Sequence, residues 1–278
     1  MRNWTLTACP PSPCKHRTAR AIVTLHGAHT VSWQSADGIE RLYLSERSAH
    51  AAGQAIRGGI PVVFPQFSNL GPLPRHGFAR TLPWQLEQRH TGSDFAGVTL
   101  SLVDSSATRK VWPYGFRAEL TLSVARNRFD VEFAVENTGS ERFDFTAALH
   151  TYLRVAHVES TQVSGLQGCT YRDQTQGGKE HVEQGSSLEF DREIDRIYLT
   201  APAEVMLRQP DQSLSASATA FPDLVVWNPW VDKCAQLADM PADGFKRMVC
   251  LEAAAIETPV LLTPGRDWWG RQTLVAIK

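Results

Sequence analysis

The sequence is poor in the features that mark several large classes of protein. Its 278 residues include only five cysteines, which are scattered and form no CxxC pair; this argues against a disulfide framework and against a structural zinc site. No segment approaches the ~18 consecutive apolar residues of a membrane span, and the N-terminal segment has no apolar run as long as a signal peptide needs. We therefore expect a protein of the reducing cytoplasm with no membrane partner.

Net charge is also nearly absent. The 28 lysines and arginines are balanced by 29 acidic residues, for a formal charge of −1. A chain without an overall basic field has no general means of holding nucleic acid, so we expect no nucleic-acid partner. Any anion that it binds must be small and held by a local cluster. Hydrophobic residues at 42% and charged residues at 21% are typical of folded globular proteins and exclude the disordered, collagen-like and coiled-coil classes.

Most of the chain consists of short segments in which apolar and polar residues alternate. A period of two indicates β strands, and turn signals between the segments, such as Asp37-Gly38, fit antiparallel hairpins better than helical crossovers. No long stretch has a helical period. We predict an all-β fold, a large antiparallel β-sandwich forming a single domain over residues 1–278, with residues 1–20 as a candidate for a less ordered N-terminal extension. The expected strands are Arg20 to Val31, Ala96 to Val103, Phe116 to Val124, Phe129 to Val135, Phe143 to Val155 and Arg247 to Ala255.

Two of these segments place a titratable residue on the face opposite the apolar one. His150 has the opposite parity from the apolar residues of Phe143 to Val155, and Glu252 stands in the same relation to those of Arg247 to Ala255. A carboxylate among apolar neighbours is salt-bridged, partly solvated in a cleft, or held at a raised pKa for chemistry. Considered alone, His150 is more often a structural histidine than a catalytic one.

A loop-rich region holds the densest group of cations. Residues 56–67 and 73–80 carry three arginines and a histidine among glycines and prolines. Proline stiffens such a loop and glycine lets backbone approach a ligand closely, while the planar guanidinium suits phosphate or carboxylate. A single arginine pairs more often with a surface acid, but the clustering favours an anion site. The candidates are Arg57, Arg75, His76 and Arg80.

Other candidate features are weaker. The aromatic segments Trp227 to Trp230 and Trp268 to Gly270 could stack on sugar faces or pack structurally, and Lys233 is expected to be solvated. There is no GxSxG motif, Cys250 lies in an apolar strand typical of packing, and the histidines lack metal-ligand spacing. We expect no metal, no other cofactor, and no serine or cysteine nucleophile.

Taken in order, several segments resemble one known family. The chain is similar, from about residue 22 to its C-terminal end, to the hexose-6-phosphate mutarotase (glucose-6-phosphate 1-epimerase) branch of the aldose 1-epimerase superfamily. The segments that carry the resemblance are IRGGIPVVFPQF, LPRHGFAR, ALHTYLRV, DRIY, VVWNPW, FKRMVCLEAA and LLTPGRDWWG. Any one of them alone would be a weak signal, but together, in this order, they are a strong one.

The resemblance implies a galactose mutarotase-like β-sandwich that binds a sugar phosphate on its concave face. It implies His150 and Glu252 as the catalytic pair, and it assigns substrate binding to Arg57, Arg80 and Asp195. Arg75 and His76 are further candidates for substrate binding. The family commonly has glutamine where this chain has Arg75, so Arg75 could add a phosphate contact or alter substrate preference.

Exchange of α and β anomers requires one acid and one base, because the ring must open and close again. We expect Glu252 to take the proton of the C1 hydroxyl and His150 to protonate the ring oxygen, with Glu252 ionised and His150 protonated. The expected enzyme is a monomeric isomerase acting on a small sugar phosphate. The alternatives are an epimerase of unphosphorylated aldoses and a non-catalytic sugar-phosphate-binding module.

Overall fold

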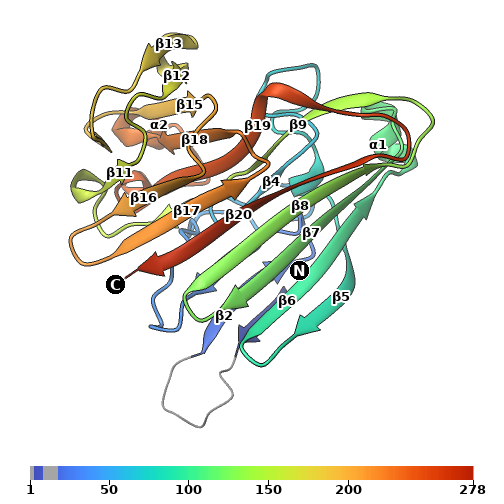
Figure 1. Ribbon diagram of the computed structural model, residues 1–278, viewed down its shortest axis with the longest axis horizontal. Helices are drawn as coiled ribbons and strands as arrows, with labels where there is room; N and C mark the ends of the chain where they lie inside the picture. The colour runs from blue at the N-terminus through green and yellow to red at the C-terminus, as the bar shows by residue number, and fades with distance from the viewer. Residues whose placement is uncertain (1–2, 9–17, 278) are drawn as a thin grey trace.

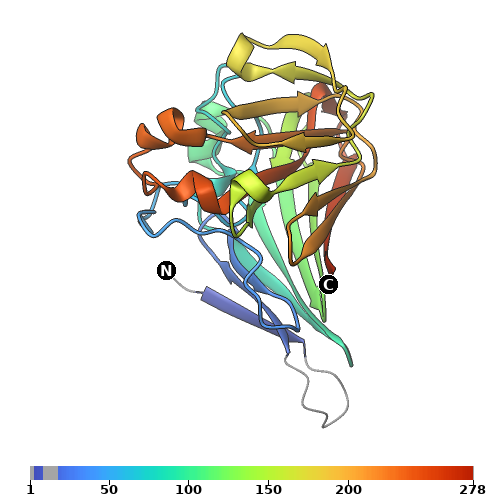
Figure 2. The ribbon, with the colours of Figure 1, turned by 90° about the vertical axis from the view of Figure 1, so that its left-hand side faces the viewer.

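The computed structural model of the protein describes residues 3–8 and 18–277. The chain forms two large antiparallel sheets that pack face to face, and a small third sheet lies at one end (Figures 1 and 2). Strands predominate and the two α helices, α1 (Ser106–Val111) and α2 (Trp230–Ala235), have six residues each. The predicted all-β antiparallel sandwich is therefore confirmed. No helix among the described residues is long and apolar enough to cross a membrane.

The first large sheet has nine strands, and the last strand in sequence lies in its middle, between β17 and β8. Its order is β14 (Ser187–Glu189), β11 (Gln162–Ser164), β16 (Glu204–Arg208), β17 (Ser213–Thr219), β20 (Asp267–Ile277), β8 (Arg128–Asn137), β7 (Phe116–Ala125), β6 (Phe95–Val103) and β5 (Gln85–Thr91).

The second large sheet has eight strands and carries the residues of chemical interest. Its order is β13 (Lys179–Val182), β12 (Thr170–Asp173), β15 (Ile194–Tyr198), β18 (Asp223–Asn228), β19 (Met248–Leu262), β9 (Phe143–Leu149) and β4 (Val62–Val63), with β10 (Tyr152–Arg154) also paired to β19. The short 3₁₀ turns are η1 (Ala79–Thr81), η2 (Val158–Ser160), η3 (Gln174–Gln176) and η4 (Gly244–Arg247).

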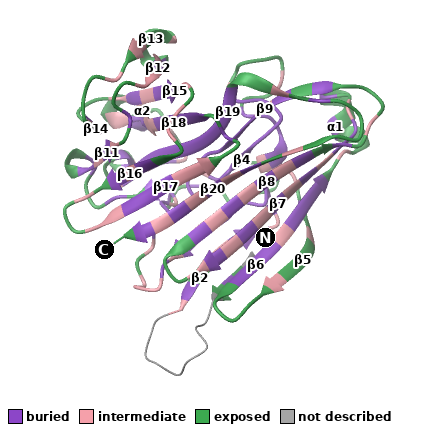
Figure 3. Cartoon of the chain, viewed as in Figure 1, coloured by how far each residue is buried: buried purple, intermediate pink, exposed green. Residues whose placement is uncertain are grey.

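The core fills the space between the two large sheets. Along β7 every second residue is buried, and β8 largely repeats the pattern (Figure 3), because alternate side chains point to opposite faces of a strand. The inward residues of both sheets join one large apolar cluster that includes Phe116, Phe133, Phe145 and Leu251. A second, smaller cluster lies on the other face of the eight-stranded sheet. It consists of Val63, Phe67, Ala148, Ile197, Val225, Ala254 and Ile256.

Two predicted strands are each divided. The segment Arg20 to Val31 forms β2 (Ala19–Thr24) and the start of β3 (Thr30–Gln34), because the chain turns through Gly27 with φ 71°. The segment Phe143 to Val155 breaks between β9 and β10, where the Thr151 N–H donates to the carbonyl of Leu149 (2.9 Å) instead of across the sheet. His150 lies at this break.

Part of the N-terminal extension expected over residues 1–20 forms a β strand. Within it, Asn3–Ala8 form β1, which pairs with β2 in the small sheet, and β1 and β2 lie against β6 and β7. Residues 1–2 and 9–17 of the expected extension lie outside the described residues.

Candidate active site

A pocket of about 310 Å³ opens on the face of the eight-stranded sheet that points away from the large core. Its floor comes from β15, β18 and β19, and its wall from the loops that precede and follow β4. All seven residues predicted for the site line it: Arg57, Arg75, His76, Arg80, His150, Asp195 and Glu252.

Strand register assembles the floor. Leu149 is paired with Ala253 and Tyr152 with Cys250, so the same register places His150 across from Glu252. Side chains directly opposite in an antiparallel pair are close neighbours on one face. Two rows of neighbours therefore cross the sheet. One is Asp195, Trp227, Cys250 and Tyr152, and the other is Ile197, Val225, Glu252 and His150.

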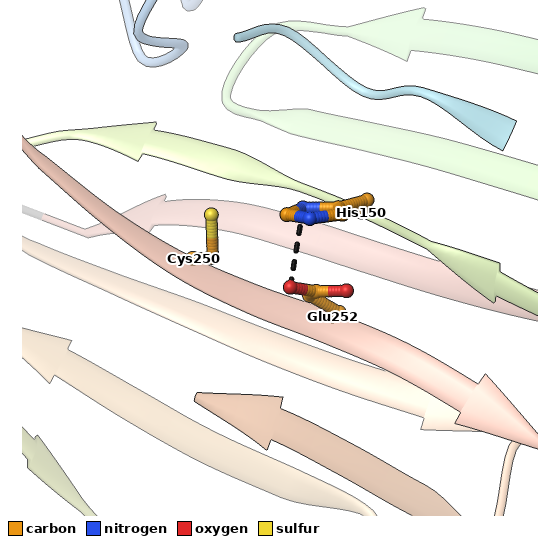
Figure 4. A group of neighbouring side chains, drawn as sticks. All are labelled: His150, Cys250 and Glu252. Carbon is orange, nitrogen blue, oxygen red and sulfur yellow. Dashed lines mark ion pairs between the residues drawn. The ribbon is translucent and has the colours of Figure 1, made fainter. Parts of the chain in front are cut away.

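The His150–Glu252 pair is buried at the bottom of the pocket. His150 Nδ1 lies 3.1 Å from Glu252 Oε1, and their side chains are 9% and 2% exposed (Figure 4). The approach is close but the N–H direction does not meet the geometry of a hydrogen bond, and His150 Nδ1 and Glu252 Oε2 have no hydrogen-bond partner among the described residues. A buried polar atom without a hydrogen-bond partner costs free energy. These two atoms are therefore suited to form hydrogen bonds with a bound molecule.

Burial also shapes the charge of the pair. Desolvation, followed by His76 and Arg80, lowers the pKa of His150 well below its ordinary value. Desolvation, followed by Asp195, raises the pKa of Glu252 well above its ordinary value. Burial thus favours a neutral imidazole and a neutral carboxyl group, opposite to the ion pair expected from sequence. The two arrangements contain the same single proton and differ only in which residue holds it.

One wall of the pocket is cationic. Arg57 is held from two sides: its Nε lies 3.2 Å from both carboxylate oxygens of Asp239, and its Nη1 donates to Tyr152 Oη at 3.0 Å. Arg80 is held less completely. Its Nη2 donates to the carbonyl of Arg75 (2.8 Å), but its buried Nε has no partner among the described residues. Burial lowers the pKa of Arg80 to about 10, which leaves it charged near neutral pH. No carboxylate among the described residues forms an ion pair with this guanidinium.

His76 contributes a neutral donor to the same wall. Its Nδ1 accepts a hydrogen bond from the backbone N–H of Ser68 (3.2 Å), so a neutral ring carries its proton on Nε2. Burial, followed by Arg80, lowers the pKa of His76 to about 2. Its ring centroid lies 5.5 Å from that of His150. His76 can therefore donate a hydrogen bond beside His150 and Glu252 without adding charge.

The opposite side of the pocket is acidic. Desolvation, followed by the nearby Glu193, raises the pKa of Asp195 to about 6. No hydrogen bond or ion pair holds the Asp195 carboxylate among the described residues. A half-buried carboxylate at a pocket wall is suited to accept hydrogen bonds from the hydroxyl groups of a ligand.

The floor also brings three possible metal ligands together. Donor atoms of His150, Cys250 and Glu252 all lie within 4.8 Å of one another (Figure 4). Burial, followed by Glu252, raises the pKa of the Cys250 thiol well above its ordinary value, and arginines line the same pocket. A neutral thiol near fixed positive charges is a poor setting for a cation. The expectation of no metal stays a prediction.

The sequence of this chain matches one family of known proteins over most of its length. The family model described as aldose 1-epimerase matches residues 14–274. This chain belongs to the aldose 1-epimerase family. A relative from Cenchrus ciliaris named "Putative glucose-6-phosphate 1-epimerase" is 32% identical over 94% of this chain and 82% of its own length. One of the same name from Escherichia coli is 35% identical over 86% and 81%.

A solved structure supports the assignment of the chain to this family. The crystal structure from Salmonella typhimurium titled as a "putative mutarotase" superposes with a TM-score of 0.88 and 30% identity, covering 99% of this chain and 90% of that one. The predicted resemblance to the aldose 1-epimerase superfamily and to its mutarotase-like fold is therefore confirmed.

The structure also revises several sequence-based expectations for this epimerase-family chain. Of the two alternatives for the Trp268 to Gly270 segment, structural packing holds for Trp268: it belongs to β20, not to a loop, and packs on Phe145 and Phe221. The two glycines of the 56–67 segment bring backbone close to backbone. A Cβ on Gly59 would lie 2.1 Å from the carbonyl oxygen of Thr30.

Sequence reasoning did not single out several pocket residues. Glu193, Gln174 and Thr175 line the pocket. Two of the weaker candidates also line it: Trp227, and Lys233, which was expected to be solvated and is only partly exposed. Tyr152 and Asp239 were also missed, although they hold Arg57 in place. Tyr152 shares the parity of His150, so the alternation in its segment could have found it. Asp239 follows α2 in a loop, and no local pattern indicates where that loop folds.

Proposed function

We propose that this protein interconverts the α and β anomers of a hexose 6-phosphate such as glucose 6-phosphate. The observation that carries the proposal is the buried pair of His150 and Glu252, 3.1 Å apart, in one pocket with the unpartnered guanidinium nitrogen of Arg80. An acid and a base suited to ring opening thus lie near a site for an anion. Relatives whose names specify glucose-6-phosphate 1-epimerase support the same assignment.

The proposed chemistry moves one proton in each direction. Glu252 takes the proton of the C1 hydroxyl while His150 donates a proton to the ring oxygen; the C1–O5 bond breaks, and C1 becomes an aldehyde. Rotation about C1–C2 presents the other face of the carbonyl. On closure, His150 removes the proton of the C5 hydroxyl and Glu252 returns a proton to the carbonyl oxygen, so the pair ends as it began.

The electrostatics of the pocket fit this cycle. The open-chain intermediate corresponds to the neutral His150 and neutral Glu252 that burial favours. The ring-closed state requires the ion pair, and the negative charge of a bound phosphate would stabilise the protonated imidazole by offsetting the nearby arginines. The two states differ by the net movement of one proton from His150 to Glu252, which takes place through the substrate.

The remaining polar groups are proposed to bind substrate. Arg57 and Arg80 would hold the phosphate, with Arg75 as a further cation, because guanidinium groups suit its oxygens and its charge. Asp195 would accept hydrogen bonds from sugar hydroxyls, and His76 would donate one. We propose further that residues 1–278 act as one domain and that the enzyme works as a monomer in the cytoplasm. Among the described residues Cys169, Cys234 and Cys250 are free thiols, as expected in a reducing compartment.

The test is the α/β exchange rate of glucose 6-phosphate and of glucose, measured side by side by NMR magnetisation exchange. We expect acceleration of the phosphorylated sugar alone. Acceleration of both sugars would favour an epimerase of broad aldose specificity, and acceleration of neither would favour a non-catalytic binding module.

Glu252→Gln is the decisive variant. The amide keeps the shape of the side chain but cannot take a proton, so we expect the rate to fall by about 10²- to 10⁴-fold. Thermal unfolding should show an intact fold. The matched control is Glu257→Gln in the same strand, whose exposed side chain pairs with Arg172 and should leave the rate unchanged. Full activity of Glu252→Gln would rule out the mechanism.

A further inference from the structure

Tyr152 is a large buried side chain that the proposed mechanism does not use. It is 2% exposed and lies in β10, in the row of floor residues next to His150. It does not line the pocket. Its position is nevertheless unusual, because it contacts both Arg57 of the cationic wall and His150 on the floor.

The first contact is with the cationic wall. Arg57 Nη1 donates to Tyr152 Oη at 3.0 Å, while Asp239 holds Nε of the same guanidinium. With Nε and Nη1 engaged, only Nη2 is left without a partner among the described residues. Burial raises the pKa of Tyr152, so its hydroxyl group stays protonated and neutral. Tyr152 thus fixes the direction in which Arg57 presents its free nitrogen.

The second contact is with the catalytic histidine. The Tyr152 and His150 rings lie parallel, with centroids 4.7 Å apart and an interplanar angle of 6°. No hydrogen bond to another described side chain orients the His150 ring, although its Nδ1 lies 3.1 Å from Glu252 Oε1. Trp227 and His76 meet this ring only at steep angles, 90° and 63°. The stacked face of Tyr152 is therefore the contact that sets the plane of the imidazole.

We propose that Tyr152 is a positioning residue that aligns the phosphate-binding Arg57 with the catalytic His150. This assignment rests on the proposed function. The hydroxyl group acts on Arg57 and the ring acts on His150, so the two effects are separable by mutation. Because both contacts come from one rigid side chain, the distance from bound phosphate to proton donor is fixed, and misplacement of a reacting group by a fraction of an ångström is costly in rate.

Two variants of Tyr152 separate the effects. Tyr152→Phe keeps the ring and loses the hydroxyl, so we expect the KM for glucose 6-phosphate to rise about 3- to 10-fold while kcat stays within about twofold. Tyr152→Leu loses both contacts, so kcat should fall by at least about tenfold below that of Tyr152→Phe. Equal kcat values in the two variants would overturn the assignment of the ring.

Tyr198→Phe is the matched control. Tyr198 is also fully buried, and its hydroxyl likewise accepts from an arginine, Arg196 (3.4 Å), while donating to Glu183 (2.8 Å), away from the pocket. Loss of this hydroxyl should lower stability without changing kcat or KM. A double variant adds a coupling test: Arg57→Ala with Tyr152→Phe should have the KM of Arg57→Ala alone within about twofold, because the hydroxyl acts through Arg57. Independent, multiplying effects would contradict the proposal.

A spectroscopic readout completes the experiment. The ring protons of His150 should resonate upfield because they lie over the tyrosine face; Tyr152→Phe should keep this shift and Tyr152→Leu should lose it.

Failure of the proposed function and failure of the Tyr152 assignment give different results. If the wild-type protein leaves glucose 6-phosphate exchange at its uncatalysed rate, the proposed function fails and this assignment fails with it. If the wild-type is active but both Tyr152 variants behave like Tyr198→Phe, the function stands and only the assignment is overturned.

Discussion

At the scale of single residues, the site depends on where one proton resides. His150 Nδ1 and Glu252 Oε1 lie 3.1 Å apart, and burial disfavours the charged form of both residues. A pair of this kind titrates as a unit, so its two macroscopic pKa values define the range in which it holds one proton. Acid/base catalysis in both directions requires that range to include the working pH.

The first prediction concerns the titration of His150 in the substrate-free protein. Because burial and nearby cations lower its pKa well below 6.5, we expect the imidazole to remain neutral as the pH falls through 6.5. NMR titration of the His150 ring measures this directly, with His150→Ala to identify the resonance. A midpoint at or above 6.5 would contradict the electrostatic description. Inorganic phosphate, bound at the arginines, should move the midpoint upward.

The second prediction concerns Asp195 and stability. Its pKa is raised from 3.8 to about 6, so the folded state binds this proton more tightly than the unfolded state does. The resulting stability is present below 3.8 and is lost as the pH rises through 6. Asp195→Asn should therefore raise the free energy of unfolding by on the order of 1–3 kcal/mol at about pH 8 and change it little below pH 4.

Urea denaturation at both pH values measures this effect. Asp211→Asn, at an exposed turn position, is the control and should change stability by less than about 0.5 kcal/mol at either pH. Asp195→Asn should also raise the KM, because the amide replaces a hydroxyl acceptor. Equal stability changes at the two pH values would rule out a perturbed Asp195.

At the scale of elements, the wall that carries Arg57 depends on a close approach between the backbone at Gly59 and the backbone at Thr30. Gly59 has φ 62°, and a Cβ there would lie 2.1 Å from the Thr30 carbonyl oxygen. Gly59→Ala should therefore lower the free energy of unfolding by about 3 kcal/mol or more and raise the KM by displacing Arg57. Gly177 has a similar φ of 70° but open space around it, so Gly177→Ala should cost only about 1 kcal/mol. Equal losses in thermal unfolding experiments would show that φ alone matters.

Elements also show what the sequence could and could not predict. Alternation correctly placed His150 and Glu252 on the face away from the core, because parity is a local property of a strand. It could not show that the two residues meet. That depends on the pairing of β9 and β10 with β19, which lie about a hundred positions apart, and register between distant strands is set by the packed sheet. The break at Thr151 was missed for the same reason, since its hydroxyl bonds to Gln272 of β20.

At the scale of the whole molecule, β20 connects the two halves of the nine-stranded sheet. It pairs with β17 on one side and with β8 on the other. We predict that deleting residues 267–278 abolishes cooperative thermal unfolding, because two ladders of backbone hydrogen bonds lose their partner and inward residues such as Leu274 leave the core. Trp269→Ser, which changes an exposed side chain of the same strand, should retain a cooperative transition. A truncated chain that still melts cooperatively would contradict this view.

The central position of β20 has a consequence for how the protein is made. A chain emerging from the ribosome exposes β5 to β8, and then β11, β14, β16 and β17, as two separate parts of the nine-stranded sheet before the strand that joins them is synthesised. Until then each set presents an unpaired edge, which is where nascent chains aggregate. The sandwich can therefore close only after translation has passed β20, and protection of those two edges by chaperones would matter most in that interval.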